Sequence, residues 1–106
     1  RTGLRLIASD IQNSPVKDVF RISIPLSEED KYGRMSWDET AVLIGVYGTN
    51  GFFDTKRGTI IVNTDGSNSW KDDEDGKHQY VIQKMPIPEM SKFIEDRMMH
   101  LPVSNQ

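Results

Sequence analysis

Asp38 has the clearest chemical potential in the sequence. It lies in the stretch Ser36-Trp37-Asp38-Glu39, a capping box, in which the serine caps the first backbone N–H groups of a helix and the glutamate three residues later bonds back. A carboxylate in the first turn interacts favourably with the helix dipole, by about 0.3–1 kcal/mol. The helix from Trp37 to Tyr47 carries no charge after Glu39, so we expect it to be buried on all sides. A carboxylate carried toward an interior needs a partner or a metal ion, which makes Asp38 a candidate metal ligand.

Two tryptophans are candidates for stacking on a sugar or a base. Trp37 stands directly before Asp38, and Trp70 precedes an acidic loop that runs from Lys71 to Gly76. For Trp70 we favour packing beside a β-hairpin over ligand binding. Trp37 is therefore the candidate substrate-binding residue.

The other chemically reactive groups in the sequence give weaker indications of a functional site. The acidic loop does not fit an EF-hand, because placing Gly76 at the sixth position puts Lys71 at the first and Ile82 at the twelfth. We expect a solvated hairpin tip there. His78 and His100 lack the spacing of metal ligands, and no nucleophile elbow or phosphate-binding glycine loop is present. No catalytic residue is assigned.

The elements around these residues are predicted from spacing and from helix-ending residues. Asn13-Ser14-Pro15 begins a helix that stops before Pro25, and Gly48 ends the helix at 37–47. Strands at 59–63 and 79–84 form a hairpin whose long connection contains a turn at Asp65-Gly66. A last helix starts near Pro88, with apolar residues on one face and charged residues, Glu95 among them, mostly opposite. The predicted fold class is an α+β fragment: helix, buried helix, β-hairpin and C-terminal helix.

Composition sets the outer limits. The 106 residues form one domain or a fragment, and the net charge of −3 with a pI near 5.3 argues against a nucleic-acid partner. No apolar run is long enough to span a membrane, and the lack of cysteine excludes disulfides and thiolate metal sites. The sequence does not distinguish a cytoplasmic from an exported protein. The chain starts at Arg1, as if within an element, so we expect it to be a piece of a longer protein.

The segment Gly33-Arg34-Met35-Ser36-Trp37-Asp38-Glu39-Thr40-Ala41-Val42-Leu43 resembles the C-terminal active-site helix of the nucleoside hydrolase family, the inosine-uridine preferring type. It is most similar to a divergent bacterial branch with a Ser-Trp-Asp-x-Thr-Ala-Val pattern. The likeness extends, in the same order of features, over roughly 14–101. It implies the C-terminal part of a doubly wound α/β fold.

The resemblance also implies an activity, which is hydrolysis of the N-glycosidic bond of ribonucleosides by a calcium-activated water. Asp38 matches the aspartate that completes the calcium shell. Trp37 stands where well-studied members have a histidine thought to protonate the leaving base. The Asp-rich N-terminal motif of the family is absent, so we expect the isolated chain to be inactive and calcium to bind only in the complete parent site.

The expected partners follow from this interpretation: a ribonucleoside in the parent protein, no nucleic acid and no membrane. The apolar face of the helix at 37–47, if left bare, would favour a homo-oligomer. One alternative is a non-catalytic module that binds a carbohydrate or a protein through exposed aromatics, Trp70 and Phe52-Phe53. Another is a hydrolase relative that has kept the fold and lost the chemistry, which Trp37 in place of histidine permits.

Overall fold

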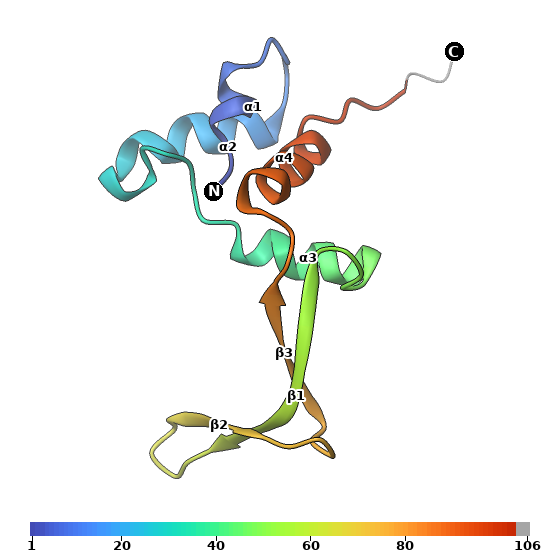
Figure 1. The fold of residues 1–106 in the computed structure, drawn as a ribbon. Coiled ribbons are helices and arrows are strands. Elements are labelled where there is room, and N and C mark those ends of the chain that lie inside the picture. The colour runs from blue at the N-terminus through green and yellow to red at the C-terminus, as the bar shows by residue number, and fades with distance from the viewer. Residues whose placement is uncertain (104–106) are drawn as a thin grey trace. The chain divides into compact units, whose positions relative to one another are not determined.

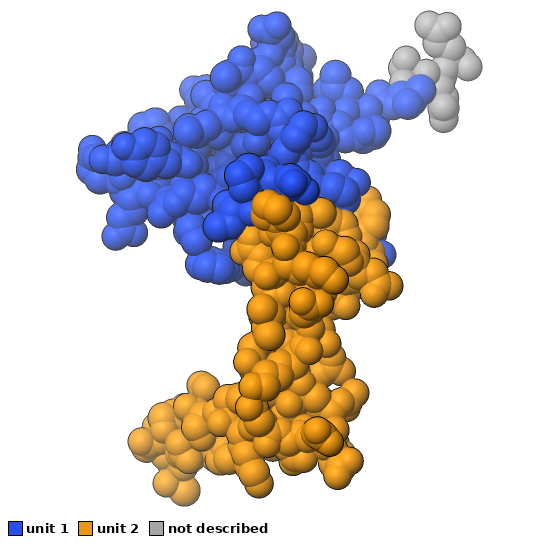
Figure 2. All heavy atoms as spheres, in the orientation of Figure 1, with its two compact units in different colours: residues 1–46, 87–106 blue, residues 47–86 orange. Residues whose placement is uncertain are grey.

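The structure is a computed structural model that describes residues 1–103. In this part of the chain it shows a small α+β fold with four α-helices and a three-stranded antiparallel sheet (Figure 1). The chain divides into two compact units, one of residues 1–46 and 87–106 and one of residues 47–86, coloured separately in Figure 2. None of the described helices has the length and apolar character needed to cross a bilayer.

The first unit packs three helices around a small apolar core. These are α1 (Leu4–Ala8), α2 (Pro15–Ser23) and α4 (Ile87–Met98). Helix α2 begins where predicted, because the Ser14 side chain accepts a hydrogen bond from the Lys17 backbone N–H at 3.2 Å. Two short 3-10 turns follow it, η1 (Ile24–Leu26) and η2 (Glu28–Asp30). The core consists of Leu6, Phe20 and Ile24, with Ile7, Ile11, Met98 and Met99 packed against it.

A buried carboxylate joins α4 to the N-terminal segment. Glu95 was predicted to face solvent, and this is wrong, since it is only 5% exposed. Its Oε1 accepts the Gly3 backbone N–H at 2.9 Å, and its Oε2 lies 3.4 Å from the Arg5 guanidinium. Gly3 has a φ of 109°, and a Cβ there would overlap the Phe20 ring, so this close approach requires glycine. Burial of Glu95 thus depends on partners distant in sequence.

Helix α3 (Trp37–Tyr47) has the predicted limits but not the predicted environment. It begins after Ser36 and ends before Gly48, whose φ of 73° suits a helix end. The expectation of burial on all sides is wrong: Leu43 is its one buried residue, while Trp37 and Val46 are 71% and 70% exposed. An apolar composition indicates that a helix favours burial, but the described residues cover only a small part of the surface of α3.

The second unit is built on β1 (Phe53–Val62), which lies between β2 (Asn68–Asp72) and β3 (His78–Gln83). The predicted turn at Asp65-Gly66 is present and connects β1 to β2. The predicted hairpin is wrong in its pairing. The strand at 59–63 pairs with β2, whose last residues, Lys71 and Asp72, fall in the predicted acidic loop, and β3 pairs with the first half of β1.

Trp70 packs within the sheet, as favoured from the sequence. Its indole ring lies against Gly58, where a Cβ would overlap it, and edge-on to Tyr80 with ring centroids 4.9 Å apart. The indole N–H donates to Asp72 at 2.8 Å. Phe52 and Phe53 are buried, so the expectation that they are exposed aromatics for binding is wrong.

Candidate functional site

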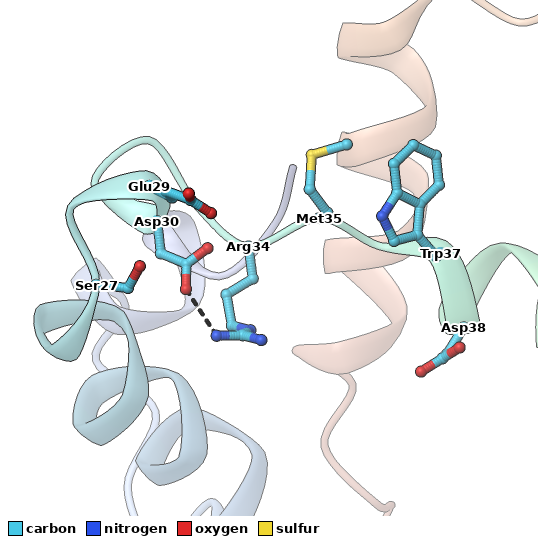
Figure 3. A pocket seen from close by; sticks show the side chains of 7 residues that line it. All are labelled: Ser27, Glu29, Asp30, Arg34, Met35, Trp37 and Asp38. Carbon is cyan, nitrogen blue, oxygen red and sulfur yellow. Dashed lines mark hydrogen bonds and ion pairs between the residues drawn. The ribbon is translucent and has the colours of Figure 1, made fainter.

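An open hollow of about 410 Å³ lies in the first unit, beside the start of α3 (Figure 3). It contains both residues that the sequence singled out, Trp37 and Asp38. The other residues come from η2 and the loop that leads into α3. The full lining is Ser27, Glu29, Asp30, Arg34, Met35, Trp37 and Asp38.

The N-terminal residues hold this loop in place. Thr2 and Arg34 form an antiparallel bridge, each donating its backbone N–H to the other's carbonyl at 2.9 Å. The Thr2 hydroxyl is 2.9 Å from that of Ser36, and Thr2 is 1% exposed. The Arg1 guanidinium donates to the carbonyls of Glu29 at 2.6 Å and Gly33 at 2.8 Å. Thus the residues just before Trp37 are fixed by contacts with the first two residues of the chain.

One wall of the hollow is an ion pair between Asp30 and Arg34. Asp30 is buried, and its carboxylate accepts from the Arg34 guanidinium at 2.6 Å, as the dashed line in Figure 3 marks. The Arg34 side chain is half exposed, so the pair lies at the border of the solvent. The sequence at 27–34 is charged and has no helical or strand periodicity, so it does not predict this wall. No local pattern in the sequence indicates this pair, because Arg34 lies in the bridge to Thr2 and not on a helix face shared with Asp30.

Trp37 and Asp38 lie at the other side of the hollow and leave the helix in different directions (Figure 3). Both side chains are exposed, so the expectation that Asp38 is carried toward an interior is wrong. Asp38 lies in the first turn of α3. The indole therefore offers a free aromatic face for stacking on a planar or apolar ligand surface. The carboxylate offers oxygen donors to a cation or to hydroxyl groups.

Calcium takes six to eight oxygen ligands, and the described residues do not supply such a set. Within residues 1–103, no group of three or more His, Cys, Asp or Glu side chains lies close enough to hold a metal ion. Asp38 alone thus does not make a calcium site, and its assignment as a metal ligand stays a prediction. The same is true of Trp37 as a substrate-binding residue.

The other candidates from the sequence have structural partners. The His78 Nδ1 accepts the Ile60 backbone N–H at 3.0 Å, which ties β3 to β1. In the acidic stretch, Asp72 pairs with Lys56 at 2.5 Å, and Asp73 accepts the Asp75 N–H at 3.0 Å. The ion pair and the N–H bond hold the pKa of Asp72 below its usual range, with Lys56 as the larger cause and the Trp70 indole as the second.

Comparison with known proteins adds no assignment. No protein-family profile, curated protein sequence or solved structure matches the chain. The site is therefore interpreted from its own geometry: an aromatic face and a carboxylate beside a polar, ion-paired wall.

Proposed function

We propose that this chain is the C-terminal part of a nucleoside hydrolase-type enzyme, which cleaves the N-glycosidic bond of ribonucleosides. In this proposal Trp37 lines the nucleoside pocket and Asp38 is one of the calcium ligands of the complete site. The observation that carries it is that both residues, which were chosen from the sequence, are exposed and border one hollow. An exposed aspartate is ordinary, so the unusual part of this observation is the large exposure of the neighbouring indole.

The exposed surface of α3 supports the same proposal. Val42 and Val46 are largely exposed, as is Trp37 at the start of the helix. Exposed apolar surface on one helix is typical of a surface that another part of a protein covers. We propose that the remainder of a doubly wound α/β fold covers this helix and contributes the other carboxylates. A second copy of the chain is the competing cover.

The chemistry available to this chain is binding and orientation. The Trp37 indole can stack on the base or on a sugar face, but it cannot exchange a proton usefully at neutral pH. Asp38 can hold ribose hydroxyls or a cation, while the Asp30–Arg34 pair provides a polar wall. Calcium, when bound by a complete ligand set, orients hydroxyls and water. The 106-residue chain alone is accordingly proposed to be inactive.

The test is ribose release by the product of the complete reading frame that contains this sequence. Inosine, uridine, adenosine and cytidine are offered with calcium or with a chelator, and free ribose is measured as reducing sugar. We expect release that the chelator abolishes and that the 106-residue chain alone does not show. Binding of nucleosides without release would indicate a relative that has lost the chemistry. A complete gene product that neither binds nucleosides nor releases ribose would contradict the proposal.

Substitution of Trp37 separates the roles of that residue. Trp37→Ala is expected to weaken nucleoside binding, which appears as a higher KM, because the stacking surface is lost. Trp37→His places a proton donor in the position that the resemblance gives to the leaving-group acid. It is expected to raise kcat by about tenfold or more, because general acid catalysis contributes 10²–10⁴-fold when well placed. Trp70→Phe, a change in the other unit, is the control.

A further inference from the structure

Strand β3 is an edge strand without the features that normally prevent edge pairing. It lies at one end of the order β2-β1-β3, and all of its residues are exposed. Natural edges are protected by lysines, prolines, bulges or short length. The other edge, β2, is shorter and carries Lys71 and Asp72. In contrast, β3 reads His-Gln-Tyr-Val-Ile-Gln, with no proline, glycine, lysine or carboxylate.

The hydrogen-bond phase of β3 identifies the residues that face outward. The Lys84 N–H donates to the Phe52 carbonyl at 3.0 Å, which continues the pairing of Phe53 with Gln83. In an antiparallel ladder the backbone groups of successive residues point alternately to the two sides. The even-numbered residues of β3 therefore bond to β1, and the N–H and C=O groups of Gln79, Val81 and Gln83 point to the free edge.

The opposite side of β1 gives the same phase independently. The Asn63 N–H donates to the Ser67 carbonyl at 2.8 Å, so the odd-numbered residues of β1 bond toward β2. Its even-numbered residues must then bond toward β3. Because Lys56 is paired with Tyr80, these are again the even-numbered residues of β3.

We propose that β3 pairs with β3 of a second copy of this chain, antiparallel about a two-fold axis at Val81, to give a continuous six-stranded sheet. A two-fold axis perpendicular to the sheet places a residue opposite itself, and Val81 is the central residue whose backbone groups face outward. Gln79 then lies opposite Gln83 of the other copy, and the three outward residues exchange hydrogen bonds in both directions. Tyr80 lies opposite Ile82.

A second copy fits this edge better than a charged or unrelated strand. The two-fold operation brings two glutamines together, valine against valine, and the tyrosine against isoleucine, and such pairs stabilise adjacent strands. No residue of β3 carries a formal charge when the histidine is neutral, so self-pairing opposes no like charges. The exposed apolar side chains, Tyr80, Val81 and Ile82, gain neighbours on both faces of the sheet.

The test uses the 106-residue chain and sedimentation from low micromolar to submillimolar concentration. We expect a monomer–dimer equilibrium. Val81→Lys opposes two lysines at the two-fold axis and should raise the dissociation constant about tenfold or more. Ile61→Lys is the matched control, because Ile61 is on the same sheet face with nearly equal exposure, 43% against 45%, but lies in the central strand. It should change the dissociation constant by less than about twofold.

A covalent probe tests the register even if a lysine variant folds poorly. The chain has no cysteine, so single replacements report one contact each. Val81→Cys places two cysteines opposite one another at about 5.5 Å between Cα atoms, in a hydrogen-bonded pair whose Cβ atoms lie too far apart for an unstrained disulfide. A short bifunctional thiol reagent should therefore crosslink them. Gln79→Cys, whose copies lie four residues out of register, should not.

Three results would overturn the proposal: a monomer at every concentration, equal effects of Val81→Lys and Ile61→Lys, or failure of the Val81→Cys protein to crosslink. A dimer that Val46→Lys dissociates and Val81→Lys does not would place the contact on α3 instead. The proposal is independent of the proposed function, because β3 and the hollow belong to different units.

Discussion

The bond between the Thr2 and Ser36 hydroxyls is the sharpest test of how the candidate site is held. Thr2→Val keeps the shape of the side chain and removes only its hydroxyl. The Ser36 hydroxyl, in a residue that is 8% exposed, then loses its partner at 2.9 Å. A buried polar group without a partner costs about 1–3 kcal/mol. Because a small part of Ser36 reaches solvent, we expect a loss of about 1–2 kcal/mol in the free energy of unfolding.

A double-mutant cycle isolates this bond from other roles of Ser36, which precedes the first residue of α3. Ser36→Ala removes the same bond and any cap of the helix, whereas the pair Thr2→Val with Ser36→Ala removes both hydroxyls together. Replacing both partners by apolar groups is close to neutral for the bond itself. The double variant should therefore be more stable than the sum of the single effects predicts, by about 1–2 kcal/mol.

The assay is urea unfolding of the 106-residue chain followed by far-UV circular dichroism. Thr2→Ser, which keeps the hydroxyl and loses one methyl group, is the matched control. An unfolding free energy of Thr2→Val within about 0.3 kcal/mol of the unsubstituted chain, or additive single effects, would refute the reasoning. The contact would then contribute nothing to the position of Trp37 and Asp38.

Three further changes follow from the contacts. The buried carboxylate of Glu95 accepts the Gly3 backbone N–H, and Glu95→Ala leaves that N–H unpaired. The unfolding free energy should therefore be about 2 kcal/mol lower than that of Glu95→Gln. Equal stabilities of the two variants would contradict this. Gly58→Ala should cost about 1–3 kcal/mol and alter the near-UV signal of Trp70, because the added Cβ overlaps that indole; an unchanged signal would count against the packing. The Lys92 hydrogen bond holds the pKa of Asp96 below its ordinary 3.8, so this stabilisation is present above that pH and is lost as the pH falls through the folded-state pKa. Urea unfolding across pH 6 to 3 should show a shallower decline for Asp96→Asn, and identical declines would refute it.

Local signals in the sequence predicted the helix limits well. Ser14 with Pro15 and Gly48 act through their own backbone geometry and nearest neighbours, so their effect does not depend on the rest of the fold. The Asp65-Gly66 turn is local in the same sense. Such features can be read in advance because the cause and its effect lie within a few residues.

Strand β2 could not be recognised in this way. Its residues Asn68 to Asp72 are mostly polar, and a sheet exposed on both faces leaves no alternation of apolar and polar residues to detect. The pairing of Ile61 with Ser69 is made by backbone groups that every residue has. Strand limits in such a sheet are set by hydrogen bonding, which composition does not record.

Contacts between distant segments account for the remaining differences. In the sequence Glu95 falls on the charged face of its helix. Its burial is favourable because its carboxylate accepts the Gly3 N–H and pairs with Arg5. For the candidate site, the sequence identified Trp37 and Asp38 but not the wall opposite them. That wall depends on the bridge between Thr2 and Arg34, which no local pattern announces.

The most direct test of the central claim compares two aspartates in the complete gene product. Asp38 and Asp18 both lie in the first turn of a helix, so replacing either by asparagine removes a similar interaction with the helix dipole. Only Asp38 borders the hollow. The account predicts that Asp38→Asn lowers calcium-dependent ribose release by about 100-fold or more while Asp18→Asn leaves it within about twofold. Equal rates for the two variants would contradict a role for Asp38 in the site.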